Sequence, residues 1–225
     1  MSAHSQILIT PEFNRAATQL ADTGRFLATH GWSPATSSNY STKFAANNSE
    51  FIAISRSGID KYTMSLTDVM VISAAPDSKS RAAFNIIGPE NAKPSAETQI
   101  HTAIYQARPN ARSILHTHSP NNTRLSLKFE DEGEVLFSGY EMQKGIEGER
   151  SHENTLKIPI LPNSQDMTAF ADLTFALLEK EWAAQAFLIA GHGLYTWGDS
   201  IATARRHVET LEFLFACRVL ELSGV

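Results

Sequence analysis

The pattern of hydrophobic and polar positions predicts helices and strands interleaved along the chain. A helix is expected from the Thr10–Pro11 cap to Gly31, because its apolar residues fall on one helical face. The same spacing predicts further helices at 95–106, 120–127, 167–182 and 200–222. Short apolar or alternating runs predict strands at 37–44, 51–55, 70–73, 82–87, 113–118, 157–161 and 186–190.

Several predicted strands follow one another without an intervening helix. The strands at 37–44 and 51–55 flank the turn-forming run Asn47-Asn48-Ser49, which predicts a hairpin. Neighbouring strands of this kind favour an α/β fold with a mixed, mainly antiparallel sheet flanked by helices over a doubly wound parallel sheet. A length of 225 residues suits one domain, spanning 1–225.

Composition and charge narrow the classes of partner. The formal net charge is −5 and the basic residues are scattered, so no nucleic-acid partner is expected. No run reaches the roughly 18 apolar residues that a membrane span needs, and no leader pattern precedes Thr10, so no membrane partner is expected either. Cys217 is the single cysteine, which agrees with a reducing compartment and predicts a cytoplasmic location.

The most informative short motif is His116-Thr117-His118, at the end of a predicted strand. Residues two apart on a strand point to the same side, so both imidazoles face one region, as a zinc site requires. Two histidines that only form hydrogen bonds near the core would give the same pattern.

A third imidazole comes from His192, which follows the apolar strand 186–190 and is flanked by Gly191 and Gly193. Glycines on both sides allow close approach of backbone and metal. Three protein ligands leave a coordination position open, which is typical of a catalytic zinc site.

Two carboxylates, Glu97 and Glu141, are further candidate site residues. Glu97 is expected in the first turn of the helix that Ser95 opens, although a favourable charge at a helix start would explain it equally well. Glu141 lies in the polar, glycine-containing run 139–145, where an ordinary surface residue would also fit.

Hydroxyl and amide groups that could hold a phosphate occur in three turn-like segments. They include Asn39, Ser57, Gly58 and Ser95, each of which is also an ordinary turn residue. Their spacing matches neither a P-loop nor a dinucleotide fingerprint.

Taken in order, these segments resemble the class II aldolase and adducin family from about residue 14 to 222. The resemblance implies a three-layer αβα fold, one Zn²⁺ per subunit held by His116, His118 and His192, and a sugar-phosphate substrate. It implies phosphate binding at Asn39, Ser57, Gly58 and Ser95. One departure is Ser38, where the family commonly has glycine just before the Asn.

The runs 31–37, 116–119 and especially 140–145 resemble a dehydratase branch of that family. That resemblance implies removal of water from 5-methylthioribulose 1-phosphate in methionine salvage, with Glu141 as acid/base. The alternatives are a sugar-phosphate aldolase of the fuculose or ribulose phosphate type, with Glu97 as acid/base, and an adducin-like interaction module without metal. The family also implies a homotetramer with sites between subunits.

Overall fold

The computed structural model describes residues 6–75, 82–89, 91–180 and 184–224. Within these ranges nine strands form a sheet in the order β4-β3-β2-β1-β5-β9-β8-β7-β6. The strands are β1 (Asn39–Ala46), β2 (Ser49–Ser55), β3 (Val69–Ala74), β4 (Phe84–Gly88), β5 (Ser113–Thr117), β6 (Glu134–Phe137), β7 (Leu156–Leu161), β8 (Ala186–Ile189) and β9 (Gly193–Gly198). The longer helices are α2 (Pro11–Thr29), α3 (Thr98–Ala107), α4 (Pro120–Lys128), α5 (Met167–Leu178) and α6 (Ile201–Leu222).

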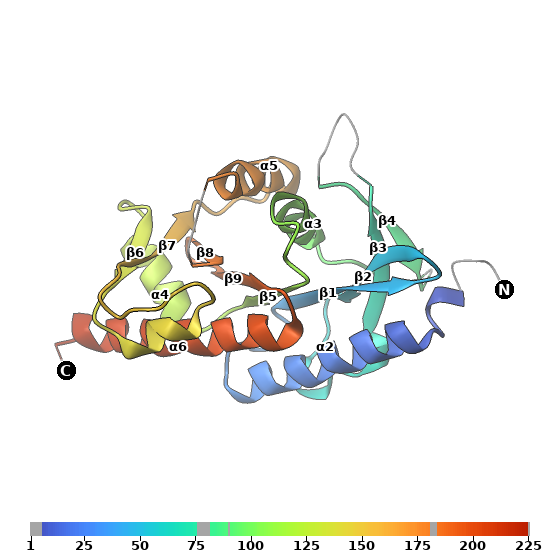
Figure 1. Cartoon of the computed structure of the whole chain (residues 1–225), viewed down its shortest axis with the longest axis horizontal. Coiled ribbons are helices and arrows are strands. Elements are labelled where there is room, and N and C mark those ends of the chain that lie inside the picture. The colour runs from blue at the N-terminus through green and yellow to red at the C-terminus, as the bar shows by residue number, and fades with distance from the viewer. Residues whose placement is uncertain (1–5, 76–81, 90, 181–183, 225) are drawn as a thin grey trace.

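Helices cover both faces of this sheet and give a three-layer αβα arrangement. Figure 1 shows α3 and α5 on one side and α2 and α6 on the other. The first helix forms because the Thr10 hydroxyl accepts from the Phe13 amide at 3.2 Å and Pro11 occupies the first turn. Its apolar face, with Phe13 and Leu20, packs in one core cluster with Phe44 of the sheet.

The predicted mixed, mainly antiparallel sheet is confirmed. β1 and β2 form the expected hairpin, with Ser41 opposite Ile54, and β7 with β8 is the parallel pair among the described strands. Two strands, β6 and β9, were not predicted. The segment forming β9 begins and ends with glycine, which is typical of loops, but its backbone pairs with β5 on one side and β8 on the other.

Two predicted helix ends were wrong. Helix α3 begins at Thr98 and not at residue 95, so Glu97 is the residue before the helix. The Ser95 hydroxyl accepts from the Glu97 amide at 3.2 Å. The helix expected over 167–182 ends at Leu178 as α5, and residues 181–183 lie outside the described ranges. Helix ends carry little periodic signal, so the spacing places them poorly.

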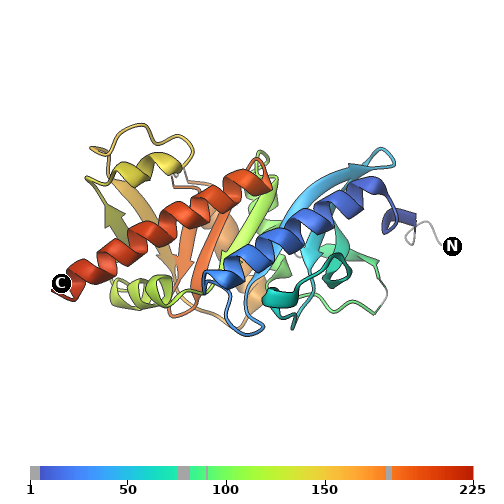
Figure 2. The ribbon, with the colours of Figure 1, turned by 90° about the horizontal axis from the view of Figure 1, so that it is seen from below.

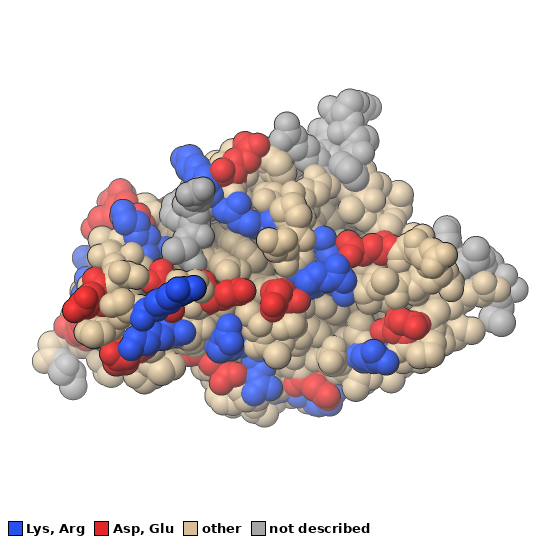
Figure 3. All heavy atoms as spheres, viewed as in Figure 1, with Lys and Arg blue, Asp and Glu red and all other residues tan. Residues whose placement is uncertain are grey.

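Charges of both signs are mixed on the face of the described residues that Figure 3 shows, where lysine and arginine lie among aspartate and glutamate. Across the described helices, none combines the length and apolar character that crossing a membrane requires.

Candidate metal centre

Three histidines from two distant parts of the chain meet at one end of β5. His116 lies on β5, His118 follows it by two residues, and His192 lies in the tight turn between β8 and β9. One ligand nitrogen of each lies within 4.8 Å of those of the other two, and among the described residues this is the group that could hold a metal ion. The three histidines predicted as ligands are therefore adjacent.

The pairing of β5 with β9 fixes the tautomer and the ring orientation of His116. Its Nδ1 donates to the Leu194 carbonyl at 2.9 Å, and its ring stacks on Tyr195 with centroids 4.0 Å apart. The other nitrogen, Nε2, is buried and has no hydrogen-bond partner among the described residues. A neutral imidazole held in one tautomer, with its free nitrogen facing the other two histidines, fits a metal ligand.

Burial also keeps two of these imidazoles uncharged. It lowers the pKa of His118 to about 4 and that of His116 well below its usual value. Both rings are neutral near pH 7 and can donate a lone pair without first losing a proton. Together with His192 they bring three imidazole nitrogens to one point, which fits a divalent transition metal with an open coordination position.

Glu97 lies directly against the three histidines. Its Oε1 is 2.8 Å from His192 Nε2 and its Oε2 is 3.6 Å from His116 Nε2. The Asn39 amide nitrogen donates to Oε2, while the Asn39 carbonyl oxygen lies at hydrogen-bonding distance from His101. Burial by itself would raise the pKa of Glu97, but the neighbouring histidines and Asn39 hold it well below its usual range. The site therefore contains an ionised carboxylate.

A polar cavity of about 350 Å³ adjoins the histidines, and all four residues predicted to bind phosphate line it. Asn39, Ser57, Gly58 and Ser95 share this wall with His118 and His192. Gly58 has a φ of +73°, a backbone conformation that favours glycine. Ser38, where the family commonly has glycine, has a similar backbone conformation, with a φ of +71°. A glycine at that position would relieve the left-handed strain that serine carries.

Three residues that support this cavity were not predicted. Arg56 lines it, and Lys61 lies buried behind it, where Nζ donates to the carbonyls of Ser37 and Ile59 at 3.0 and 2.8 Å. Lys61 thus joins the two loops of the cavity wall. Tyr195 orders His116 by stacking. A lysine in a turn and a tyrosine in a short strand carry no sequence signal of such roles.

Glu141 does not lie with the other candidates within its own chain. It begins the short helix η3 (Glu141–Gly145) and pairs with Lys144 at 2.5 Å and His152 at 3.0 Å. The next residues contact α6, where Arg206 donates to the Gly145 carbonyl at 3.0 Å. The same part of α6 contacts β9 at the residue that pairs with Ile114. Ile114 lies near the amino end of β5. The histidines lie at its carboxyl end, just before α4 begins, and Figure 2 shows η3, in yellow, and α4, in yellow-green, at opposite ends of the strands.

A buried carboxyl group, Glu212 of α6, lies beneath the segment that follows His118. Its Oε1 accepts from the Asn122 amide at 2.9 Å, and burial raises its pKa to about 7. Because the folded pKa exceeds the unfolded value of about 4.3, the native state holds more protons between these values and loses stability as pH rises.

We expect Glu212→Gln to remove this loss, so that the variant is more stable than the parent by up to about 3 kcal/mol at pH 8 and by only about 1 kcal/mol at pH 5. Urea unfolding at both pH values measures the difference. Glu209→Gln, a half-buried position on the same helix whose carboxylate pairs with Arg205, is the matched control. Equal differences at the two pH values would contradict the assignment of a protonated Glu212.

Known proteins match most of this chain in sequence. A family model described as "Class II Aldolase and Adducin N-terminal domain" matches residues 18–219. The methylthioribulose-1-phosphate dehydratase of Hahella chejuensis is 40% identical, with 92% of this chain and 94% of the relative covered. The same-named protein of Methylococcus capsulatus is 40% identical over 91% of this chain and 93% of its own.

The fold has relatives among solved structures. An L-fuculose 1-phosphate aldolase superposes with a TM-score of 0.71 at 20% identity, covering 93% of this chain and 87% of the aldolase. At that identity the likeness shows a shared fold. Together with the match over residues 18–219, it establishes that this chain belongs to the class II aldolase and adducin family.

Proposed function

We propose that this chain is a zinc-dependent hydro-lyase that converts 5-methylthioribulose 1-phosphate to 5-methylthio-2,3-dioxopentyl phosphate and water. The observation that carries the proposal is the meeting of His116, His118 and His192 beside a hydroxyl-lined cavity. The names of the 40% identical relatives support the substrate and its place in methionine salvage. We place the reaction in the cytoplasm, in keeping with the single cysteine.

His116, His118 and His192 would hold the zinc. When bound, zinc supplies a Lewis acid that lowers the cost of removing a proton beside the substrate carbonyl. The hydroxyls of Ser57 and Ser95 and the backbone at Gly58 would bind the phosphate, with Arg56 on the same wall as a counter-charge. Asn39 would orient Glu97, since its amide is engaged by Glu97 and His101.

The reaction needs a base for the proton on carbon 3 and an acid for the hydroxyl that leaves carbon 4. The proton lost from carbon 3 and the hydroxyl lost from carbon 4 together make the water. The enol that remains gains a proton at carbon 4, loses the proton of its carbon 3 hydroxyl and becomes the second ketone. We assign Glu141 to proton transfer at the leaving hydroxyl, which requires that it reach the histidines of another subunit.

A homotetramer with sites between subunits, as the family resemblance implies, would meet this requirement. In the single chain Glu141 is exposed, and the Lys144 ammonium holds its pKa below the usual value, which does not suit an acid. Burial against a second copy would raise that pKa toward the range of a general acid.

Glu141→Gln is expected to lower kcat for the dehydration by about 100- to 10,000-fold, because a positioned acid/base group contributes that much. Zinc content and unfolding should not change, since Glu141 lies in an exposed ion pair and contacts none of His116, His118 and His192. Mass spectrometry of the product gives the rate. Glu153→Gln, another exposed glutamate close by, is the control. Full activity of Glu141→Gln would remove Glu141 from the mechanism.

The second candidate function is a sugar-phosphate aldolase that breaks a carbon–carbon bond. The observation that favours it is Glu97, an ionised carboxylate already in contact with His192 at 2.8 Å. Under this alternative Glu97→Gln abolishes turnover, Glu141→Gln retains it, and the purified protein cleaves a ketose 1-phosphate into two fragments. A purified protein that retains no metal would instead support the adducin-like interaction module.

A further inference from the structure

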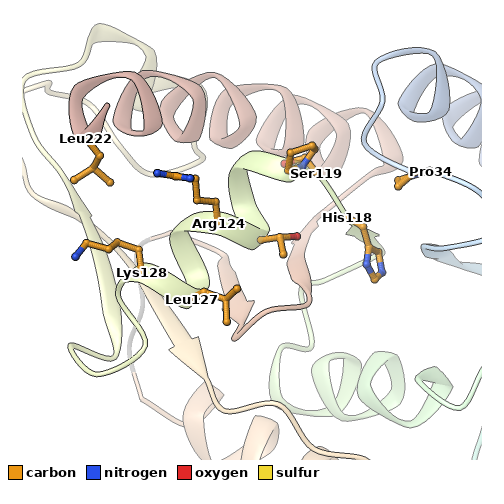
Figure 4. A pocket seen from close by; sticks show the side chains of 9 residues that line it. Pro34, His118, Ser119, Arg124, Leu127, Lys128 and Leu222 are labelled. Carbon is orange, nitrogen blue, oxygen red and sulfur yellow. The ribbon is translucent and has the colours of Figure 1, made fainter. Parts of the chain in front are cut away.

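A second cavity also reaches His118, and none of the four predicted phosphate residues lines it. Its volume is about 820 Å³, and apolar atoms form most of its wall. Pro34, Pro120, Leu127 and Leu222 contribute to it, and His118 lies at one end (Figure 4). His118 therefore belongs to both cavities, one polar and one apolar.

Leu127 also connects the apolar wall with the histidine cluster, through a contact that does not involve His118. One methyl carbon of Leu127 would lie 3.0 Å from a Cβ placed on Gly191, the residue before His192. From the same helix, the Thr123 hydroxyl donates to the His192 carbonyl at 3.2 Å. The apolar face of α4 thus adjoins the point at which the metal would be held.

We propose that the end of this cavity between His118 and Leu127 binds the methylthio end of the substrate, an inference that rests on the proposed function. The substrate carries a dianionic phosphate on carbon 1 and an apolar thioether on carbon 5, with the reacting carbons between them. When the reacting carbons lie at the histidines, the two ends extend away from them and can enter different cavities. A polar cavity and an apolar one match those ends in chemistry.

The basic residues of the apolar cavity do not favour the reverse orientation. Arg124 and Lys128 extend toward Leu222, away from His118 (Figure 4). Hydroxyls, turn amides and Arg56 lie beside the histidines in the polar cavity instead. A phosphate therefore finds short-range donors on that side, and a thioether finds carbon atoms on the α4 side.

The test compares the native substrate with ribulose 1-phosphate, whose carbon 5 bears a hydroxyl in place of the methylthio group. Leu127→Ala should lower kcat/KM for 5-methylthioribulose 1-phosphate by about 5- to 20-fold, since it removes apolar contact with the thioether. The inhibition constant of ribulose 1-phosphate should change by less than about twofold, because that compound makes little use of the contact. Leu127→Met, which keeps the volume, should restore most of the loss.

Leu173→Ala is the control, because Leu173 is an exposed leucine on α5 outside the cavity. Equal losses for substrate and inhibitor in Leu127→Ala would overturn the assignment, since Leu127 would then act through the histidines. An unchanged kcat/KM would also overturn it. So would a change confined to the oligomer mass in light scattering, which would indicate that a second copy of the chain covers this wall. Failure of the parent protein to dehydrate the substrate at all would overturn the proposed function itself.

Discussion

His192→Ala should lose metal and lower kcat/KM for dehydration by about three orders of magnitude. Removal of one of three ligands leaves two imidazoles, and Lewis-acid stabilisation worth several kcal/mol is lost with the metal. His192 is the suitable position because its side chain is partly exposed, at 20%, whereas His116 is fully buried and its removal would open a cavity. Metal content by mass spectrometry and turnover by product mass measure the two effects.

The matched control for this substitution is His30→Ala. His30 is an exposed histidine at the end of α2, outside the metal cluster. It should keep about one zinc per chain and near-parental turnover. A His192→Ala protein that retained both metal and activity would show that this histidine is not a ligand, and the assignment of the centre would fail with it.

Gly193→Ala should destabilise the fold by more than about 3 kcal/mol and lose metal at the same time. A Cβ at this position would lie 2.2 Å from the Thr117 carbonyl oxygen and 3.0 Å from His116 Cε1. Backbone cannot yield as a flexible side chain can, so β9 must separate from β5 just where their pairing orders His116. Urea unfolding followed by metal analysis of the folded fraction tests both consequences.

Gly133→Ala separates this steric effect from the general cost of replacing a glycine. Gly133 has a φ of +73° and open space where a Cβ would lie, so its cost should be about 1 kcal/mol with no effect on metal. Similar losses of stability at the two positions would mean that the close approach of β9 and β5 has no special importance.

Much of the site could be predicted from the sequence because its groups are carried by local patterns. Strand alternation places His116 and His118 on one side, and the glycines around His192 permit a tight turn. The helical spacing and the adjacent strands likewise predicted the flanking helices and the mixed sheet, which the structure confirms. These features depend on residues close together in the chain, which is why their pattern is visible without the fold.

Other features arise from contacts between segments far apart in the chain. Nothing near Lys61 or Tyr195 in the sequence indicates that one joins two cavity loops and the other stacks on His116. The strand β9 has a loop-like sequence, and its pairing with β5 and β8 makes it a strand. Its amide and carbonyl groups are satisfied only by neighbours that the sheet supplies.

Glu97 and Glu141 show most clearly the difference between what the sequence predicts and what the tertiary structure decides. The sequence by itself determined that Glu97 and Glu141 were candidates for proton transfer, because the motifs around them resemble those of the class II aldolase and adducin family. Only the tertiary structure decided that Glu97 contacts the histidines of its own chain, while Glu141 lies at the other end of the strands. The physical reason is that proton transfer requires proximity, and distances between distant segments are set by how strands pair and helices pack.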